Sequence, residues 1–299
     1  MTRIAYWDFD EFAEAINGVS GRFVPTARAE TEWWVRNAPV AGVSVQQLQI
    51  GAAATFVGDG KENSITLGLP ATAQQHIRID GELIEDNSFV LCRAGQLFTA
   101  ATAHATQWTG IHVPLDHASL APEFHDSLQA AALHGTHSKS DLTQVASARQ
   151  LTSRLFADDG TVDFSEPTAV HAMEQEITAT VSHLLEASSE TEPVRGGRPR
   201  FSRDSIVARA LELIEESDDQ PVLLRDLCLA TQVSERTLRN IFQEYFGVGP
   251  MRMLKVTQLS EIRSALVAAD AGETTIAGIV TSRPRVATPI GVSYKRSTK

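Results

Sequence analysis

The sequence has 299 residues, which is enough for two domains of ordinary size. Apolar residues make up 42% of it, which is close to the globular norm. No apolar run approaches the roughly 20 residues that span a bilayer, so we expect no membrane-spanning segment. The N-terminal segment lacks a basic stretch followed by an apolar one, so we expect a cytoplasmic protein in which Cys92 and Cys228 are reduced, buried thiols.

The net charge of −11 argues against a nucleic-acid-binding protein only if the chain is treated as one object. Residues 1–187 contain 10 Lys and Arg against 23 Asp and Glu, a balance of −13, whereas residues 204–299 contain 12 of each sign. Residues 188–203 contain 4 Arg and 2 Glu, a balance of +2. A neutral domain binds DNA if its basic residues share one face, so nucleic acid stays open as a partner of the rear part.

The stretch from about Val40 to Leu115 is typical of a β-rich domain. Apolar and polar residues alternate with a period near two over 43–50, 64–69 and 76–80. Asp80-Gly81 is a strong hairpin signal, and we expect further turns at 58–60, Gly95 and Gly110. Many short strands with regular turns predict a small barrel or sandwich.

Helical spacing follows the strands, over Pro122–Leu133, Lys139–Phe156 and Pro167–Ala187. An apolar stripe on the last segment favours pairing of two subunits; it consists of Met173, Ile177, Val181, Leu184 and Leu185. Residues 188–203 then have the Pro, Gly and charge content of a linker. We therefore predict an effector or dimerisation domain over 1–187, a linker over 188–203 and an all-helical domain over 204–299.

The rear domain contains the pattern of a helix-turn-helix unit. Asp204 is the expected N-cap of a helix with Ile206, Ala210, Leu213 and Ile214 on one face. A short helix over 223–231 follows, then the tight connection Gln232-Val233-Ser234, and then a second helix over 235–246 with Ser234 as its N-cap.

The second helix of this unit has an apolar and a polar face. Leu238, Ile241, Phe242, Tyr245 and Phe246 fall at helical spacing and are expected to pack on the preceding helix. The opposite face presents side chains suited to base reading, namely Arg236, Arg239, Asn240 and Gln243. Ser234, Thr237 and the N-terminal amides are expected to bond a phosphate. Considered alone, the same pattern also fits an amphipathic hairpin with a solvated polar face.

The run VSERTLRNIFQEYFGVGPMRMLKVTQLSEIRSALVAADAGETTIAGIV, with the preceding LLRDLCLAT, resembles the DNA-binding domain of the AraC/XylS family of bacterial transcription regulators. The matching residues include Val233, Ser234, Arg236, Leu238, Phe242, Phe246, Gly247 and Pro250. The resemblance covers about the last third of the chain. It implies two helix-turn-helix units joined by one long helix, each unit reading a successive major groove. Arg236, Arg239 and Asn240 match the base-reading positions of the family's first unit.

The second unit departs from the family's pattern. After Thr275–Val280 the family continues with a Gly-aromatic turn and a second recognition helix, whereas this sequence has Pro284 and Pro289 there. Two alternative explanations stay open: real divergence, and a local error in the determined gene sequence. Four basic residues of the segment are candidate phosphate contacts; they are Arg283, Arg285, Lys295 and Arg296.

The front domain resembles the β-rich effector domain of a subset of the same family, often described as cupin-like. The resemblance rests on Trp33-Trp34, Gln46–Leu48, Leu67–Pro70 and Arg93-Ala94-Gly95. It implies an α+β chain, with a cupin-like barrel and trailing helices in front of an all-α double helix-turn-helix domain. The residues that bind an effector are not identified by the sequence.

Three function classes stay open for the front domain: an effector sensor, a cupin-like metal enzyme and a ligand-independent dimerisation module. His104, His112 and His117 lack the spacing of a metal site, and no catalytic signature is present, so we expect no enzyme and no cofactor. We therefore interpret the chain as an effector-responsive activator of catabolic genes. The expected partners are double-stranded promoter DNA, a small-molecule effector, a second copy of the chain and RNA polymerase.

Overall fold

The computed structural model describes residues 2–71, 76–117, 124, 126–128, 136–157, 166–189, 203–217 and 222–268. The chain divides into two compact units, one with Met1–Arg200 and Ile241–Val248 and the other with Phe201–Asn240 and Gly249–Lys299. Each unit is described by itself, and the continuous helix over residues 235–246 is described with the rear unit.

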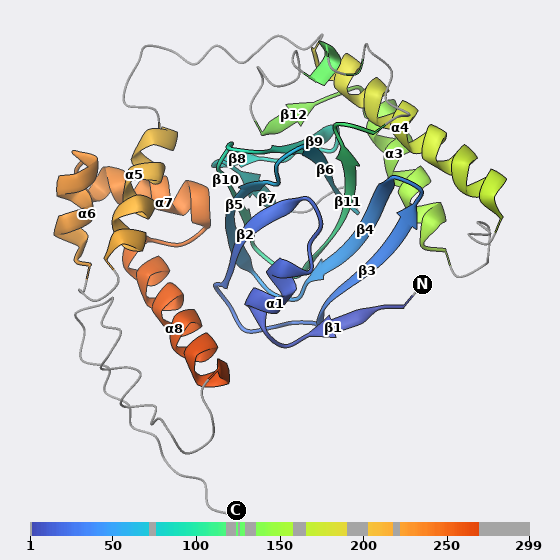
Figure 1. Ribbon diagram of the computed structural model, residues 1–299. Coiled ribbons are helices and arrows are strands. Elements are labelled where there is room, and N and C mark those ends of the chain that lie inside the picture. Colours follow the sequence, from blue (N-terminus) through green and yellow to red (C-terminus); the bar gives the residue numbers. More distant parts are fainter. Residues whose placement is uncertain are drawn as a thin grey trace, which may run out of the picture. The chain divides into compact units, whose positions relative to one another are not determined.

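The front unit contains two antiparallel sheets followed by helices (Figure 1). The larger sheet has seven strands, in the order β1 (Ile4–Tyr6), β3 (Trp33–Val40), β4 (Val43–Ile50), β11 (Thr106–Pro114), β6 (Ser64–Pro70), β9 (Ser88–Arg93) and β12 (His137–Lys139). The smaller sheet has five strands, in the order β2 (Val19–Pro25), β5 (Ala54–Gly60), β10 (Phe98–Thr102), β7 (Ile77–Ile79) and β8 (Glu82–Leu83). A short helix, α1 (Phe9–Glu14), lies between β1 and β2 in the chain.

The predicted alternating segments form strands. Segment 43–50 is β4, segment 64–69 lies within β6, and segment 76–80 contains β7. Asp80 and Gly81 have φ values of 50° and 82° and connect β7 to β8, as the hairpin signal predicts. The front unit is therefore β-rich with trailing helices, as predicted, and its strands form two antiparallel sheets.

Two of the predicted turns are wrong. Residues 58–60 end β5, and Gly110 lies inside β11. An added Cβ on Gly58 would lie 2.2 Å from the Ser20 carbonyl oxygen, so glycine permits the close approach of β2 and β5. Of these three predicted turns, the one at Gly95 is correct, and Gly95 has a φ of 71°.

The alternation of side chains across the larger sheet separates two apolar cores. One core lies between this sheet and the helices, and the other lies between the two sheets. Strand β11 contributes to both, since Ile111 and Val113 belong to the first core and Trp108 to the second. The larger sheet is therefore covered on both faces.

The helices behind the larger sheet are α3 (Leu142–Leu155) and α4 (Pro167–Ser189). The predicted segment 139–156 began too early, because Lys139 pairs with Ser88 as the last residue of β12. Of the predicted segment 122–133, the structure describes 124 and 126–128, which are helical. Ser188, Ser189 and Arg203, at the edges of the predicted linker, are helical as well.

The apolar stripe of α4 does not have the role that the sequence analysis gave it. All five of its residues are buried against the larger sheet and α3; they are Met173, Ile177, Val181, Leu184 and Leu185. A stripe that is already buried within its own chain is not available to pair two subunits.

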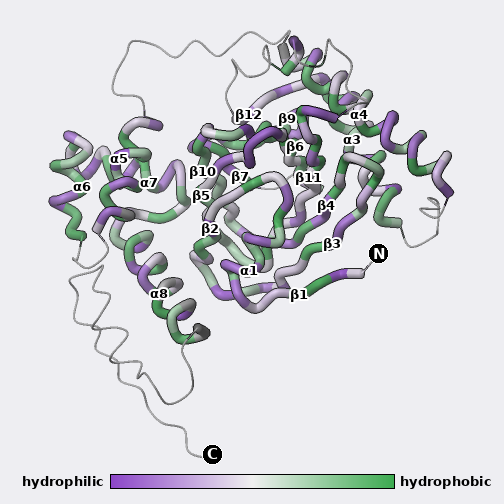
Figure 2. Tube along the Cα trace, viewed as in Figure 1, coloured by the Kyte–Doolittle hydropathy of each residue, from purple (hydrophilic) through white to green (hydrophobic). Residues whose placement is uncertain are grey.

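The described part of the rear unit is entirely helical, with α5 (Arg203–Glu216), α6 (Leu224–Thr231), α7 (Glu235–Phe246) and α8 (Pro250–Ala268). Figure 2 shows hydrophilic and hydrophobic residues alternating along these helices, as in amphipathic helices that pack on one side. The predicted cap Asp204 lies inside the first turn of α5, and Leu213 is only half-buried. Among the described residues, no helix is both long and apolar enough to cross a membrane.

Candidate nucleic-acid interface and ligand cavity

The connection between α6 and α7 has the local structure of a tight helix-helix turn. The Asp226 carboxylate accepts a hydrogen bond from the Leu223 backbone N–H at 2.9 Å, which caps the start of α6. Gln232 ends α6 in the left-handed conformation, with φ of 56°. Ser234 Oγ accepts a hydrogen bond from the Thr237 backbone N–H at 3.2 Å, so Ser234 is the predicted N-cap of α7.

The polar face of α7 is exposed. Its four predicted base-reading residues are all exposed and follow the i, i+3, i+4, i+7 spacing of one helix face; they are Arg236, Arg239, Asn240 and Gln243. Ser234 and Thr237 are exposed beside the start of this face. The structure therefore brings the six predicted residues of the first unit together on one surface, which we call the α7 face.

The opposite side of α7 is buried. The five predicted apolar residues have exposed fractions of 4% or less; they are Leu238, Ile241, Phe242, Tyr245 and Phe246. The rings of Phe242 and Phe246 lie 5.0 Å apart between centroids. Because this side is buried by packing, the α7 face is the side of the helix that stays exposed.

Two residues of the α7 face already have partners that the sequence analysis did not identify. Arg239 Nε donates to Glu235 Oε1 at 2.9 Å, and Gln243 Nε2 donates to the Gly247 carbonyl oxygen at 2.7 Å. The i, i+4 spacing of an acidic and a basic residue was the available signal for the first of these contacts. A contact with a base would compete with these partners.

The predicted contacts of the second unit lie outside the described residues. These are Arg283, Arg285, Lys295 and Arg296, with the entry segment Thr275–Val280. Helix α8, which the resemblance makes the link between two units, has 19 residues. At 1.5 Å per residue, its length is about 28 Å.

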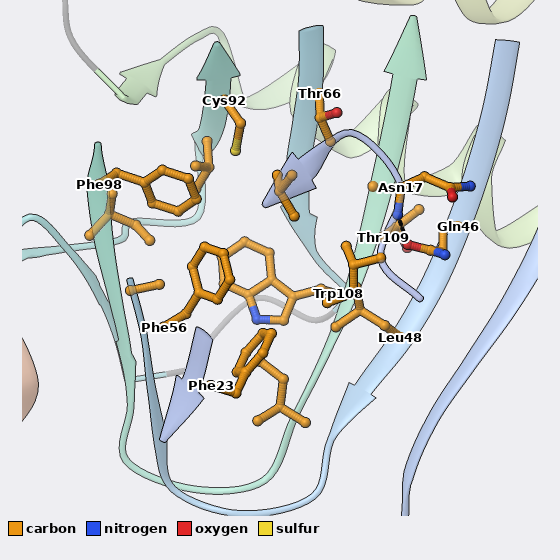
Figure 3. A pocket seen from close by; sticks show the side chains of 18 of the residues that line it. Asn17, Phe23, Gln46, Leu48, Phe56, Thr66, Cys92, Phe98, Trp108 and Thr109 are labelled. Atoms are coloured by element: carbon orange, nitrogen blue, oxygen red, sulfur yellow. Dashed lines mark hydrogen bonds between the residues drawn. The ribbon is translucent and has the colours of Figure 1, made fainter. Parts of the chain in front are cut away.

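A second candidate site lies inside the front unit. A cavity of about 100 Å³ is lined by residues of both sheets and of the segment after α1 (Figure 3). Four of these residues are aromatic and give the cavity an apolar body; they are Phe23, Phe56, Phe98 and Trp108. Another six are polar; they are Asn17, Gln46, Thr66, Thr102, Thr109 and His112. No Asp, Glu, Lys or Arg occurs among the described residues that line it.

Most of the polar residues of the cavity have hydrogen-bond partners within the protein. Gln46 Nε2 donates to the Ala15 carbonyl oxygen and to Asn37 Oδ1, each at 2.7 Å, and Gln46 Oε1 accepts from the Asn17 backbone N–H at 3.0 Å. Thr66 Oγ1 lies 3.1 Å from His112 Nδ1. Figure 3 shows Asn17 and Gln46 together, on one side of the Trp108 ring.

The two titratable residues of the cavity are neutral at pH 7. Burial, assisted by the charge of Asp80, raises the pKa of the Cys92 thiol to about 12. Burial, assisted by the charge of Lys61, holds the pKa of His112 below its usual range. The cavity therefore contributes no formal charge.

The histidines considered for a metal enzyme are not brought together. His112 lines the cavity, His117 Nε2 lies 2.6 Å from Glu174 Oε1, and His104 is exposed at 3.6 Å from Glu30. Among the described residues, no group of three or more His, Cys, Asp or Glu residues has the arrangement of a metal site.

The chain is similar to some proteins that are already known. No family model matches the chain. A curated relative from Rhodococcus erythropolis, described as "Probable thc operon regulatory protein", is 30% identical over 111 residues. The match covers 36% of this chain, and the chain spans about a third of that relative's length, 33%.

Solved structures that are similar to the chain include those of two further proteins. The crystal structure of the AraC-like transcriptional activator CuxR has 12% identity and a TM-score of 0.43, covering 94% of this chain and all of that one. The crystal structure of ToxT from Vibrio cholerae O395 has 9% identity and a TM-score of 0.28, covering 82% of this chain and 95% of that one.

An operon regulatory protein and an AraC-like activator are thus both among the proteins to which this chain is similar. The curated relative is an operon regulatory protein, which agrees with the transcription regulator that the sequence predicts.

Proposed function

We propose that this protein is a sequence-specific DNA-binding transcription regulator in which the α7 face lies in the major groove. The observation that supports this most directly is the exposed row Arg236, Arg239, Asn240 and Gln243 on a helix whose other side is buried. Arginine is suited to bidentate bonds with guanine, and asparagine and glutamine to bonds with adenine. A major groove about 12 Å wide admits one such helix.

The start of α7 is suited to a phosphate contact. Its first backbone N–H groups point out of the helix end, and the helix dipole favours an anion there. Ser234 Oγ and Thr237 Oγ1 lie 2.9 Å apart at this end, and both residues are exposed. In the proposed complex these hydroxyls contact the DNA backbone and fix the register of α7. The other four residues of the α7 face then select the bases.

The rest of the proposed mechanism follows the resemblance. A second helix-turn-helix unit follows α8, with phosphate contacts from Arg283, Arg285, Lys295 and Arg296. The front domain over 1–187 senses a small molecule, the linker over 188–203 connects it to the DNA-binding domain over 204–299, and two copies of the chain bind adjacent grooves. The protein activates catabolic genes in the cytoplasm, through RNA polymerase, and catalyses no reaction.

Replacing Arg239 tests the central assignment. On a binding site selected from random duplexes, Arg239→Ala is expected to cost about 1–3 kcal/mol of binding free energy and to relax discrimination at one base pair. Arg209→Ala is the matched control, because Arg209 is an exposed arginine of the same unit on α5. Fluorescence anisotropy against the selected site and each single-base variant measures both effects.

Two results contradict the assignment. If Arg239→Ala weakens binding equally on every duplex, Arg239 contacts a phosphate and does not read a base. If the wild-type chain prefers no duplex over random competitor at low salt, the α7 face does not read DNA.

A further inference from the structure

The cavity of the front unit has a specific chemical character that goes beyond a general sensing role. Its lining contains four aromatic side chains and, among the described residues, no formally charged one. An ionised ligand group placed in such an environment loses its hydration without gaining a counter-charge, which is strongly unfavourable. The cavity therefore favours neutral ligands over carboxylates, phosphates and amines.

The volume of the cavity restricts the size of the ligand. An engineered apolar protein cavity of about 150 Å³ is large enough to bind benzene. The present cavity, at about 100 Å³, is of the same order. A ligand of about one six-membered ring matches this volume, and a flat ring packs well among Phe23, Phe56 and Phe98.

One buried polar atom of a residue that lines the cavity has no hydrogen-bond partner among the described residues. Trp108 Nε1 is buried and makes no hydrogen bond among the described residues, although Trp108 lines the cavity. A buried N–H without an acceptor destabilises the protein, and a ligand that supplies the acceptor relieves that cost. Gln46, by contrast, already has both of its amide hydrogens and its oxygen bonded to the protein.

We propose that this cavity binds a neutral ligand of about one aromatic ring that places a hydrogen-bond acceptor against the indole N–H of Trp108. The proposal rests on the sensing role given to the front domain and names the class of effector. Figure 3 shows the Trp108 ring in the middle of the lining, with Phe56 and Phe23 around it. In that arrangement the rings hold the body of the ligand, and Trp108 selects its polar group.

Three small probes of similar size test the proposal. Benzonitrile is neutral and has an acceptor, ethynylbenzene has the same shape without that acceptor, and benzoate has a negative charge. Isothermal titration calorimetry on the full chain at pH 7.5 is expected to rank benzonitrile about tenfold tighter than ethynylbenzene. Benzoate is expected to be more than about tenfold weaker than benzonitrile.

Two variants connect the ranking to Trp108. Trp108→Phe removes the N–H and is expected to reduce the preference for benzonitrile over ethynylbenzene to within about twofold. Trp33→Phe is the matched control, because Trp33 is also buried with an unpartnered Nε1 but does not line the cavity. It is expected to keep the tenfold preference.

A third variant fills the cavity. Gly110 lies on the same side of β11 as Trp108 and His112, and a Cβ added there would meet only Thr66 Cγ2, at 3.7 Å. Gly110→Val is therefore expected to fold, because a β-branched residue suits a strand, and to weaken benzonitrile binding by more than about tenfold.

Several results overturn the proposal. It is wrong if benzoate binds as tightly as benzonitrile, if none of the probes binds at millimolar concentration, or if Gly110→Val binds benzonitrile as the wild type does. It is also wrong if Trp108→Phe keeps the tenfold preference. Were that variant not to fold, the ranking of the three probes on the wild type would still decide. DNA binding by the same proteins is measured separately, so that a failure of the cavity and a failure of the α7 face are distinguished.

Discussion

The two candidate sites of this protein differ in exposure and in charge. The α7 face consists of polar side chains that are exposed on one side of a helix. The cavity consists of neutral side chains that are buried between two sheets. At the first site, charge attracts a charged polymer and water screens each contact. At the second site, exclusion of water and charge selects the ligand. The two sites should therefore respond to different perturbations.

The largest expected difference concerns packing. Phe242 is fully buried behind the α7 face, and Phe242→Ala is expected to cost about 3–5 kcal/mol of unfolding free energy and to abolish DNA binding. Benzonitrile binding by the front unit should persist. Leu229→Ala is the control, because Leu229 on α6 is 75% exposed and its removal should change stability by less than about 0.5 kcal/mol. Urea denaturation followed by circular dichroism measures both; equal losses in the two variants would contradict the packing of α7.

Salt provides the next contrast. Raising the salt concentration from 50 to 200 mM is expected to weaken DNA binding by more than about tenfold, because phosphate contacts release counterions. The affinity for benzonitrile is expected to change by less than about twofold, because neither partner is charged. Anisotropy and calorimetry on one protein preparation compare the two. A DNA affinity that does not depend on salt would remove the phosphate contacts from the proposal.

A smaller difference between the two units is expected in how their stability depends on pH. Burial lowers the folded-state pKa of His112 and of His137, in the latter against the opposing effect of Glu82, so the unfolded chain takes up a proton first. The stability of the front unit is therefore complete above the usual histidine pKa and falls as the pH drops from about 7 toward 5. All nine histidines lie within residues 1–187, so this effect should be absent from the rear unit.

Thermal unfolding followed by tryptophan fluorescence measures the pH effect. All four tryptophans lie in the front part of the chain, so their fluorescence reports on that unit alone. The midpoint by fluorescence should fall between pH 7 and pH 5, and the double variant His112→Gln, His137→Gln should reduce this fall. If the double variant retains the full pH dependence, other groups cause it.

The smallest expected effect concerns the ion pair on α7. Glu235→Gln frees the Arg239 guanidinium and removes a negative charge near the phosphates, so DNA should bind up to about fivefold more tightly, as expected for an exposed pair worth less than about 1 kcal/mol. Glu212→Gln makes the same charge change at an exposed position on α5 and should have less effect. In an Arg239→Ala background, Glu235→Gln should lose most of its benefit; a full benefit there would mean that general charge alone is responsible.

The α7 face could be predicted from the sequence because all of its determinants are local. The cap at Ser234, the spacing of Leu238 and Phe242, and the left-handed Gln232 lie within about three helical turns of one another. The bounds of α7 and the exposed row on it follow from that pattern alone. Of its two internal partners, Glu235 could have been found from the i, i+4 spacing of opposite charges.

The cavity could not be predicted in the same way. Gln46 and Trp108 face it from strands that are more than 60 positions apart in the sequence, and only the antiparallel pairing of β4 and β11 brings these strands together. Gly68 and Gly110 are direct partners across β6 and β11, which leaves space on the cavity side. Without the register, Gly110 resembled a turn residue, and the stripe on α4 resembled an interface. The role of Gly110 and the role of the α4 stripe both depend on contacts between distant parts of the sequence, which no local pattern encodes.

Strand β11 has a consequence for how the front unit responds to an occupant. Its residues alternate between the cavity and the helix-facing core, so Trp108 and Gly110 lie on one surface while Ile111 and Val113 pack with α3 and α4 on the other. A tightly packed interior transmits small displacements and does not absorb them. A guest molecule that moves this strand by a few tenths of an ångström must therefore also rearrange the hydrophobic layer beneath α4, the last described helix before the predicted linker.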